Sequence, residues 1–243
     1  MNLIVDSLHI SGLDSGSGKT ALLLHGWGND HRSLTQIADS LKGYRVIAPD
    51  LPGFGGSQSP KEVWGVNEYA EFVVKLLDKL EVKEVELLIG HSFGGRISVY
   101  MAGTGMIPID RLVLMASHGL PEPKTIKGMM IWSLARLGKL MPKFIRQPVG
   151  RRFTSSDFRA AQGIMQDVFK KVIAQDATTQ ARAIKCPTLL IYGSEDRITP
   201  PLMGQKFNEL IEHSKLELVE GEDHHLHQHS PDKITKLIEE FIK

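Results

Sequence analysis

The hydrophobic pattern of the chain switches repeatedly between two kinds of stretch. Short, nearly continuous apolar runs, typical of buried strands, lie at 21–24, 45–48, 84–89, 112–116, 187–192 and 216–219. Between them apolar residues recur at helical spacing, which predicts helices at 33–41, 67–80, 96–102, 202–211 and 230–242. Residues 3–12 alternate loosely and predict one or two opening strands. Strands that alternate with helices predict an α/β fold, with a mostly parallel sheet covered by helices on both faces.

Two of the predicted helices carry specific start signals. Asn67 is the expected N-cap of a helix whose apolar stripe is Tyr69, Phe72, Val73, Leu76, Leu77 and Leu80. Ser230 is the expected N-cap of the last helix, and Pro231 suits its first turn.

The glycine-rich stretch 14–20 ends in Gly18-Lys19-Thr20, as a phosphate-binding loop does. Such a loop needs a glycine five positions before Gly18, and Leu13 stands there instead. The apolar residues that follow predict a strand, whereas a phosphate-binding loop opens a helix. We therefore expect a hairpin loop here and no nucleotide site.

The alternation of strands and helices stops between Pro121 and Arg182. This stretch is helical in pattern, holds four of the nine methionines, and has twelve Lys and Arg residues against four Asp and Glu. The formal net charge of the whole chain is +1, so positive charge is concentrated here. Because the stretch shows no core of its own, we interpret residues 121–182 as a small helical cap inserted into a single domain, 1–243.

Length and composition are those of an ordinary globular protein. With 243 residues, 42% hydrophobic and 23% charged, one α/β domain with a large core is expected. No apolar run reaches the roughly 18 residues that span a bilayer, and the N-terminus lacks the pattern of a signal peptide.

The one cysteine, Cys186, cannot form an internal disulfide, which fits a cytoplasmic location. The near-neutral charge favours no particular partner, and we expect no nucleic-acid binding. The sequence leaves the oligomeric state open.

The apolar run at 84–89 ends at Gly90-His91-Ser92-Phe93-Gly94. The Gly-x-Ser-x-Gly spacing is the signature of a nucleophile elbow, in which a strand turns directly into a helix. Glycines on both sides relieve the crowding, and the serine hydroxyl then stands clear of the sheet. A turn without chemistry could show the same pattern, so the interpretation depends on partners elsewhere in the chain.

A serine hydroxyl becomes an effective nucleophile when a base accepts its proton and a third group orients that base. Asp196 follows the predicted strand 187–192, and His224 follows the predicted strand 216–219. Both residues therefore lie at carboxyl ends of strands, where open α/β sheets build their sites. The order Ser92, Asp196, His224 is the order given for α/β-hydrolases.

The chain resembles the α/β-hydrolase fold superfamily, especially its small, capped bacterial serine hydrolases of the carboxylesterase type. The resemblance covers nearly the whole chain outside the cap. It rests on five motifs in order: His25-Gly26-Trp27-Gly28, the Gly- and Pro-rich loop 49–57, Gly90-His91-Ser92-Phe93-Gly94-Gly95, Gly193-Ser194-Glu195-Asp196 and Gly221-Glu222-Asp223-His224.

The resemblance implies a role for each motif. Ser92 would be the nucleophile, His224 the general base and acid, and Asp196 the carboxylate that orients His224. The backbone N–H groups of Trp27 and Phe93 would form the oxyanion hole, where each donor lowers the barrier by about 2.7–4 kcal/mol. The resemblance implies no cofactor.

Two of these roles have competitors nearby. Glu195 is adjacent to Asp196, but the family spacing from Gly193 selects Asp196. His224 matches the family position of the base, and we expect solvated neighbours around a helix start at His225, His227 and His229. The same histidines could be interpreted as metal ligands. No cysteine or carboxylate elsewhere completes a ligand set, so we expect no metal.

The cap should roof the substrate pocket, and Met130 and Trp132 are its candidate pocket residues, since their side chains suit an adaptable apolar site. The expected function is hydrolysis of small to medium carboxylic esters through an acyl-Ser92 intermediate. Thioester, lactone or carbon–carbon bond hydrolysis uses the same triad and stays open, as does a slow ligand-receptor or signalling role. The basic residues of the cap favour a solvated exterior, and they leave open weak attraction to an anionic substrate or a membrane surface.

Overall fold

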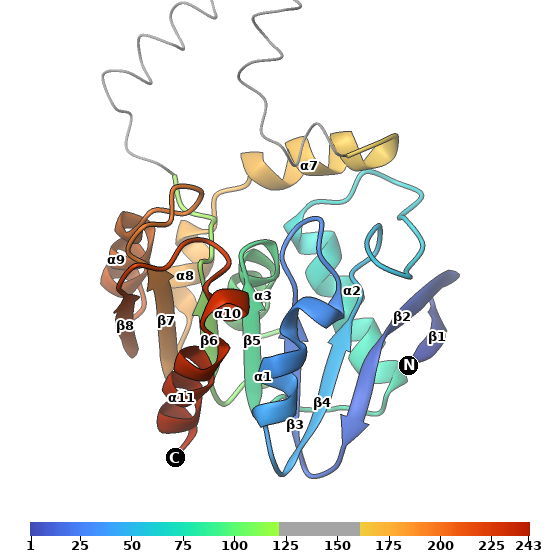
Figure 1. The fold of residues 1–243 in the computed structure, drawn as a ribbon. Helices are drawn as coiled ribbons and strands as arrows, with labels where there is room; N and C mark the ends of the chain where they lie inside the picture. The colour runs from blue at the N-terminus through green and yellow to red at the C-terminus, as the bar shows by residue number, and fades with distance from the viewer. Residues whose placement is uncertain (122–160) are drawn as a thin grey trace, which may run out of the picture.

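One sheet forms the middle layer of the computed structural model, which describes residues 1–121 and 161–243 (Figure 1). The first strands, β1 (Asn2–Val5) and β2 (Leu8–Gly16), run antiparallel to their neighbours. The other six are parallel to one another: β3 (Lys19–Leu24), β4 (Tyr44–Pro49), β5 (Leu87–His91), β6 (Leu112–Met115), β7 (Thr188–Gly193) and β8 (Ser214–Val219). Their order across the sheet is β1-β2-β4-β3-β5-β6-β7-β8. The predicted α/β fold with a mostly parallel sheet is confirmed.

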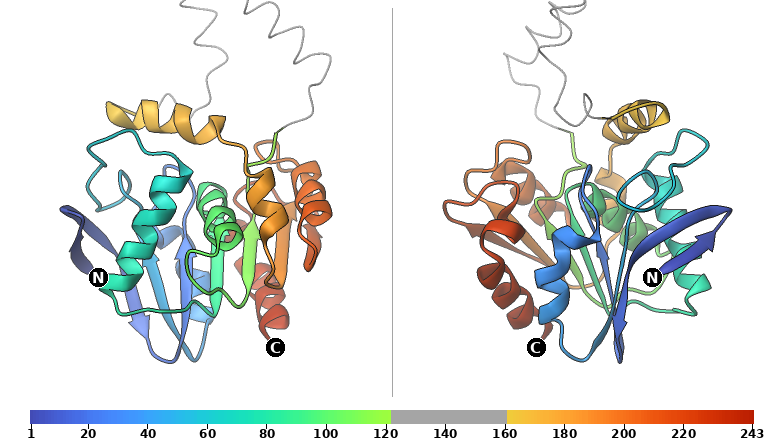
Figure 2. Two further views of the ribbon diagram at one scale, coloured as in Figure 1. Left: turned by 180° about the vertical axis from the view of Figure 1, so that it is seen from behind. Right: turned by 45° about the vertical axis from the view of Figure 1, so that its right-hand side comes forward.

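Helices cover both faces of this sheet (Figure 2). One face carries α2 (Val66–Lys79), α3 (Phe93–Thr104), α8 (Thr178–Ala183) and α9 (Pro201–Leu210). The other carries α1 (Thr35–Ser40), which follows the single turn η1 (His31–Leu34), together with α10 (Leu226–His229) and α11 (Pro231–Ile242). A further helix, α7 (Ile164–Ala174), lies over the carboxyl ends of the strands (Figure 1).

Burial on both faces explains the continuous apolar runs of the central strands. In β3, Leu22 and Leu24 pack under α2 and α3, whereas Leu23 faces α1 and α11. In β5, Leu88 and Ile89 face the two layers in the same alternating way. Successive strand residues point to opposite faces, so in a strand covered on both faces every residue is buried and apolar residues follow one another without a break.

Two helices are not capped by the side chains that the sequence predicts. Asn67 was the predicted N-cap of α2, but the helix begins after Gly65, whose N–H donates to the Glu68 carboxylate at 2.6 Å. The Asn67 side chain instead accepts a hydrogen bond from Gln175. Ser230 does precede α11, but its hydroxyl donates to Glu222 and caps no backbone N–H. In both places the side chain of the expected cap binds another side chain instead.

The predicted hairpin at 14–20 is wrong. β2 continues to Gly16, and a short turn leads into β3, but β4 lies between these two strands in the sheet. β2 pairs with β4 instead, and the Arg45 guanidinium makes two hydrogen bonds of 2.9 Å to the Asp14 carboxylate across this pair. The chain therefore crosses over one strand at this turn.

Most of the predicted cap, including Met130 and Trp132, lies outside the described residues. Of its remainder, α7 and α8 are helical, as the pattern predicts. α8 packs against α3 within the layer that covers the sheet. The boundaries of the cap stay a prediction. Along residues 1–121 and 161–243, no helix is both long and apolar enough to cross a membrane.

Leu88→Ala tests the packing of the central strand. Leu88 is fully buried in β5, so truncation should lower the free energy of unfolding by about 2–5 kcal/mol. Leu218→Ala in β8 is the matched control, because 46% of Leu218 is exposed and its truncation should cost less than about 0.5 kcal/mol. Urea unfolding measures both variants, and equal losses would contradict the central position of β5.

Candidate active site

Ser92 occupies a sharp turn between β5 and α3. Its backbone dihedral angles are φ 50° and ψ −106°, a strained combination for a residue other than glycine. A side chain on Gly94 would overlap the Leu24 carbonyl oxygen, and one on Gly90 would overlap the Ser98 hydroxyl. The glycines of the motif are therefore needed because the turn packs directly against β3 and its own helix.

Ser92, His224 and Asp196 form one line of hydrogen bonds. His224 Nε2 lies 3.0 Å from Ser92 Oγ, and His224 Nδ1 lies 2.8 Å from Asp196 Oδ2. With the Nδ1–H donating to the carboxylate, Nε2 presents its lone pair to the serine hydroxyl. The other carboxylate oxygen, Asp196 Oδ1, accepts the backbone N–H groups of Ile198 and Thr199 at 2.8 and 2.7 Å. These two bonds fix the carboxylate, and the arrangement can move a proton away from Ser92.

The loops that carry Asp196 and His224 are bonded to each other. The Glu195 N–H donates to the Glu222 carbonyl at 2.9 Å, and the Gly221 N–H donates to the Ser194 hydroxyl at 2.9 Å. Asp196 is 3% exposed and His224 6% exposed, whereas the side chain of Glu195 faces solvent. The structure therefore joins Asp196, and not its acidic neighbour, to His224.

Two backbone N–H groups beside Ser92 are available to a ligand. Neither the Trp27 nor the Phe93 N–H donates a hydrogen bond to another of the described residues. Phe93 is the first residue of α3, so its N–H also lies at the positive end of the helix dipole. The Gly94 N–H donates to the His25 carbonyl at 3.0 Å and holds the two segments together. This geometry suits a negative charge that develops next to Ser92.

His25 fixes the turn before Trp27. Its Nε2 accepts the Leu51 N–H at 2.9 Å, so its Nδ1–H donates to the Gly26 carbonyl at 2.8 Å. Complete burial lowers the pKa of His25, which keeps the ring neutral as these two bonds require. The role of His25 is therefore to hold the turn.

His91 and His227 form a buried pair next to His224. The ring centroids lie 4.1 Å apart, and His91 Nε2 donates to the backbone carbonyl of His224 at 3.0 Å. Burial lowers the pKa of both rings, that of His227 to about 3. The expectation of solvated neighbours is therefore wrong for His227, which is 1% exposed, although it fits the half-exposed His229.

A comparison with protein families identifies the chain. Residues 21–237 match the model of the alpha/beta hydrolase family. The protein belongs to this family. The Ser92 turn, the fold and the strand order all agree with this assignment.

Sequence relatives of this α/β-hydrolase include two named hydrolases from Pseudomonas. A 2-hydroxy-6-oxo-2,4-heptadienoate hydrolase from Pseudomonas putida is 28% identical, over 94% of this chain and 91% of its own length. A 2-hydroxymuconate semialdehyde hydrolase from Pseudomonas sp. (strain CF600) is 30% identical, over 77% of this chain and 74% of its own.

Solved structures share the fold of this α/β-hydrolase. An esterase from Exiguobacterium antarcticum has a TM-score of 0.75 at 21% identity, over 98% of this chain and 97% of its own. A bacterial membrane phospholipase A has a TM-score of 0.80 at 23% identity, over 100% and 84%. These identities are low, so the likeness concerns the fold.

A mainly apolar hollow of about 430 Å³, here called the apolar hollow, has Trp27 in its wall. It is lined by Trp27, Gly28, Gly53, Phe54, Ser59, Ala161, Gln162 and Met165. The Trp27 ring packs edge-on against Phe54 and Phe169, at centroid distances of 4.9 and 5.0 Å. Sequence reasoning missed Phe54 and Met165 as pocket residues. Phe54 stands in a Gly- and Pro-rich loop with no periodicity, and only its place in the family motif could have pointed to it.

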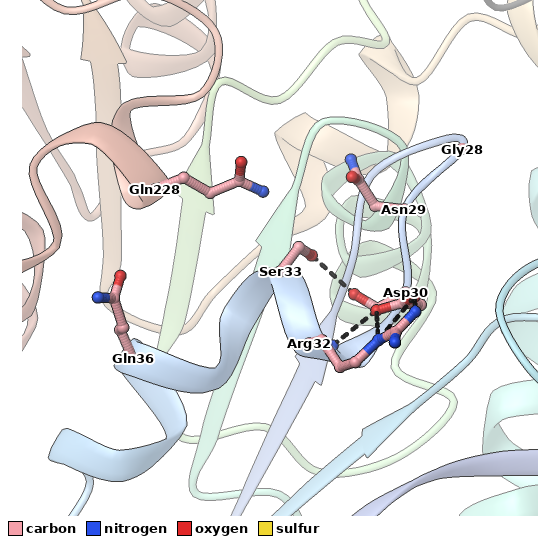
Figure 3. Close-up of a pocket in the computed structure, with 7 residues that line it drawn as sticks. All are labelled: Gly28, Asn29, Asp30, Arg32, Ser33, Gln36 and Gln228. Atoms are coloured by element: carbon pink, nitrogen blue, oxygen red, sulfur yellow. Dashed lines mark hydrogen bonds and ion pairs between the residues drawn. The ribbon is translucent and has the colours of Figure 1, made fainter.

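A second, polar hollow of about 400 Å³ shares Gly28 with the first (Figure 3). It lies between η1, α1 and α10, and is lined by Gly28, Asn29, Asp30, Arg32, Ser33, Gln36 and Gln228. Figure 3 shows Arg32 bonded to Asp30 and the Ser33 hydroxyl bonded to the Asp30 carbonyl. The charges are thus paired within the hollow, which is open and polar and does not resemble an acyl pocket.

Asp30, His31 and Asp50 form a group of three metal-ligand types in the described part of the chain, with ligand atoms within 4.8 Å of one another. Asp50 Oδ1 already accepts from the His31 ring and its Oδ2 from the Gly56 N–H at 2.8 Å. Burial raises the pKa of Asp50, but these hydrogen bonds outweigh it and the pKa falls below its usual value. Both oxygens are thus used to fix the loops, and the cluster serves as a structural network.

The buried His227 should make the protein sensitive to acid. In the unfolded chain the ring takes up a proton near pH 6.5, but in the folded protein only near pH 3. The unfolded state therefore binds more protons between these values, and stability is lost as the pH falls below 6.5. His227→Leu should reduce the stability difference between pH 7.5 and pH 5 by about 2 kcal/mol.

Urea unfolding at both pH values measures this effect. His9→Leu, at an exposed position of β2, is the matched control for replacing a histidine by leucine. If the His227 variant keeps the full pH dependence of the wild type, the neutral buried state of His227 is contradicted.

Proposed function

We propose that this α/β-hydrolase is a serine esterase that cleaves small to medium carboxylic esters through an acyl-Ser92 intermediate. The observation that carries the proposal is the line of hydrogen bonds from Asp196 through His224 to Ser92 Oγ. The unpaired N–H groups beside Ser92 supply the second requirement of acyl transfer, a site for the oxyanion.

Each residue has a defined role in this reaction. His224 Nε2 accepts the proton of Ser92 Oγ as the oxygen attacks the ester carbonyl, and Asp196 stabilises the imidazolium that forms. The N–H groups of Trp27 and Phe93 donate to the oxyanion of the tetrahedral intermediate. His224 then gives its proton to the departing alcohol, which leaves the acyl group on Ser92. Water, deprotonated by His224, attacks the acyl group, and the carboxylic acid is released as Ser92 regains its proton.

The surroundings of the site support a small apolar acyl group. The apolar hollow begins at Trp27, one of the two proposed oxyanion donors, and Phe54 and Met165 form part of its wall. A methionine wall is adaptable, which suits acyl groups of more than one length. Met130 and Trp132 stay proposed pocket residues of the cap. A cytoplasmic location also belongs to this proposal, supported by the single cysteine.

The named relatives favour a second candidate function, hydrolysis of a carbon–carbon bond. One relative carries the name 2-hydroxy-6-oxo-2,4-heptadienoate hydrolase, and another the name 2-hydroxymuconate semialdehyde hydrolase. The same Ser92, His224 and Asp196 arrangement could act on a ketone carbonyl of such a substrate. The esterase proposal and this alternative therefore differ in the substrate and not in the residues.

Ser92→Ala tests the nucleophile. Loss of the hydroxyl should lower kcat for p-nitrophenyl butyrate by at least about 10⁴-fold, because the acyl intermediate cannot form. Ser40→Ala is the matched control, since the Ser40 hydroxyl donates to the Ile37 carbonyl within α1 and should not affect turnover. Steady-state hydrolysis rates of the purified wild type and both variants measure the effect. Equal activity of wild type and Ser92→Ala would refute the proposal.

A substrate panel separates the two candidate functions. We expect kcat/KM for p-nitrophenyl acetate or butyrate to exceed that for a 2-hydroxy-6-oxo-dienoate by at least about tenfold, since the wall beside Trp27 is apolar and has no described cation to bind a substrate carboxylate. Both rates are measured spectrophotometrically on the same enzyme sample. The reverse preference would favour the carbon–carbon hydrolase, and inactivity on both with capture of a ligand would favour a receptor role.

A further inference from the structure

Arg96 is a buried cation in the first turn of α3, one turn after Ser92. It is 6% exposed, and no carboxylate among the described residues pairs with it. Its Nη1 donates to the Val172 carbonyl at 2.8 Å and to the Gln175 carbonyl at 3.3 Å, while its Nη2 donates to His118 Nδ1 at 2.8 Å. Burial lowers the pKa of Arg96 to about 10, so the side chain stays charged at neutral pH.

The two carbonyl groups that Arg96 binds belong to the end of α7. This helix leaves its last carbonyls without intrahelical partners, and a cation there also interacts favourably with the helix dipole. Arg96 therefore connects the C-terminal end of α7 directly to the helix that begins at Ser92. The planar guanidinium can reach both α7 and His118 at once, which a lysine ammonium cannot.

The opposite part of α7 forms a wall of the apolar hollow. Met165 lines the hollow, and a side chain on Gly53 would overlap the Met165 thioether, so the two are in close contact. Phe169, one helical turn further on, packs against the Trp27 ring. Val168, between them in the sequence, is fully buried. A change in the position of α7 would thus move one side chain that lines the hollow, Met165, and one that packs on the Trp27 ring, Phe169.

We propose that Arg96 is a positioning residue for acyl-chain selectivity: by holding the end of α7, it keeps Met165 in the wall of the apolar hollow and Phe169 against the Trp27 ring. This inference rests on the proposed esterase function. Longer acyl chains depend on that wall, whereas an acetyl group is held by the oxyanion donors and needs no contact with it.

The test compares p-nitrophenyl acetate with p-nitrophenyl hexanoate in wild type, Arg96→Met and Arg96→Lys. Each methylene that the wild type buries should raise kcat/KM by about fourfold. In Arg96→Met the hexanoate-to-acetate ratio of kcat/KM should fall at least about tenfold, mainly through KM, with acetate turnover within about twofold of wild type. Arg96→Lys should recover part of the ratio, because it keeps the charge but can satisfy fewer acceptors.

Arg45→Met is the matched control for loss of an anchored arginine. Arg45 donates to the Asp14 carboxylate across β2 and β4 and to the Leu80 carbonyl. It makes no hydrogen bond to α7, so its replacement should leave the hexanoate-to-acetate ratio unchanged. Hydrogen exchange of the peptide 164–175 gives a readout that does not require turnover. It should become faster in Arg96→Met and stay unchanged in Arg45→Met.

Any one of four results would overturn the inference. An unchanged ratio in Arg96→Met would show that Arg96 does not set selectivity, and equal losses on acetate and hexanoate would show that it supports the Ser92 turn instead. Unchanged exchange of α7 would show that Arg96 does not hold this helix. A wild type without ester activity would overturn the proposed function as well, whereas an active wild type with an unchanged ratio overturns only the role of Arg96.

Discussion

The strained backbone of Ser92 is the constraint on which the rest of the site depends. Its φ of 50° is maintained because neighbouring segments bond to the turn: the Ser92 N–H donates to the Met115 carbonyl at 3.0 Å, and the Gly94 N–H to the His25 carbonyl. The ends of β3, β5 and β6 are thereby drawn to one point. The same contacts that stabilise the turn also place the Trp27 and Phe93 N–H groups beside the hydroxyl. The contacts that maintain the strained backbone of Ser92 therefore also preorganise these two donors.

Much of this arrangement could be predicted because it has local signatures. Strands buried on both faces give continuous apolar runs, which are hard to mistake for loops. Once the strands are known, parallel topology places every loop after a strand at the same edge of the sheet, and this edge gathers Ser92, Asp196 and His224. The sequence could select Asp196 over Glu195 through the family spacing, and the structure adds that the Glu195 side chain faces solvent.

The features that sequence reasoning missed are decided by distant partners. The turn after Gly16 has the local chemistry of a hairpin, but β4, which comes later in the chain, inserts between the two strands and pairs with β2. Asn67 is a residue type that often caps helices, but its side chain accepts a hydrogen bond from Gln175. His227 is polar in sequence, and only the short helix α10 turns it onto His91. No window of the sequence contains both members of such pairs.

The place of each site residue in the sheet has a consequence for how activity would be lost. Ser92 follows β5, in the interior of the sheet, whereas His224 follows β8, which lies at the edge of the sheet formed by the described strands. Edge elements with exposed side chains open at lower free energy than the centre. Detachment of β8 would carry His224 away and disturb the Asp196 loop bonded to it, while the Ser92 turn stayed intact. Heat or denaturant would then inactivate the enzyme by local opening, before the core unfolds, and cooling could restore it without refolding.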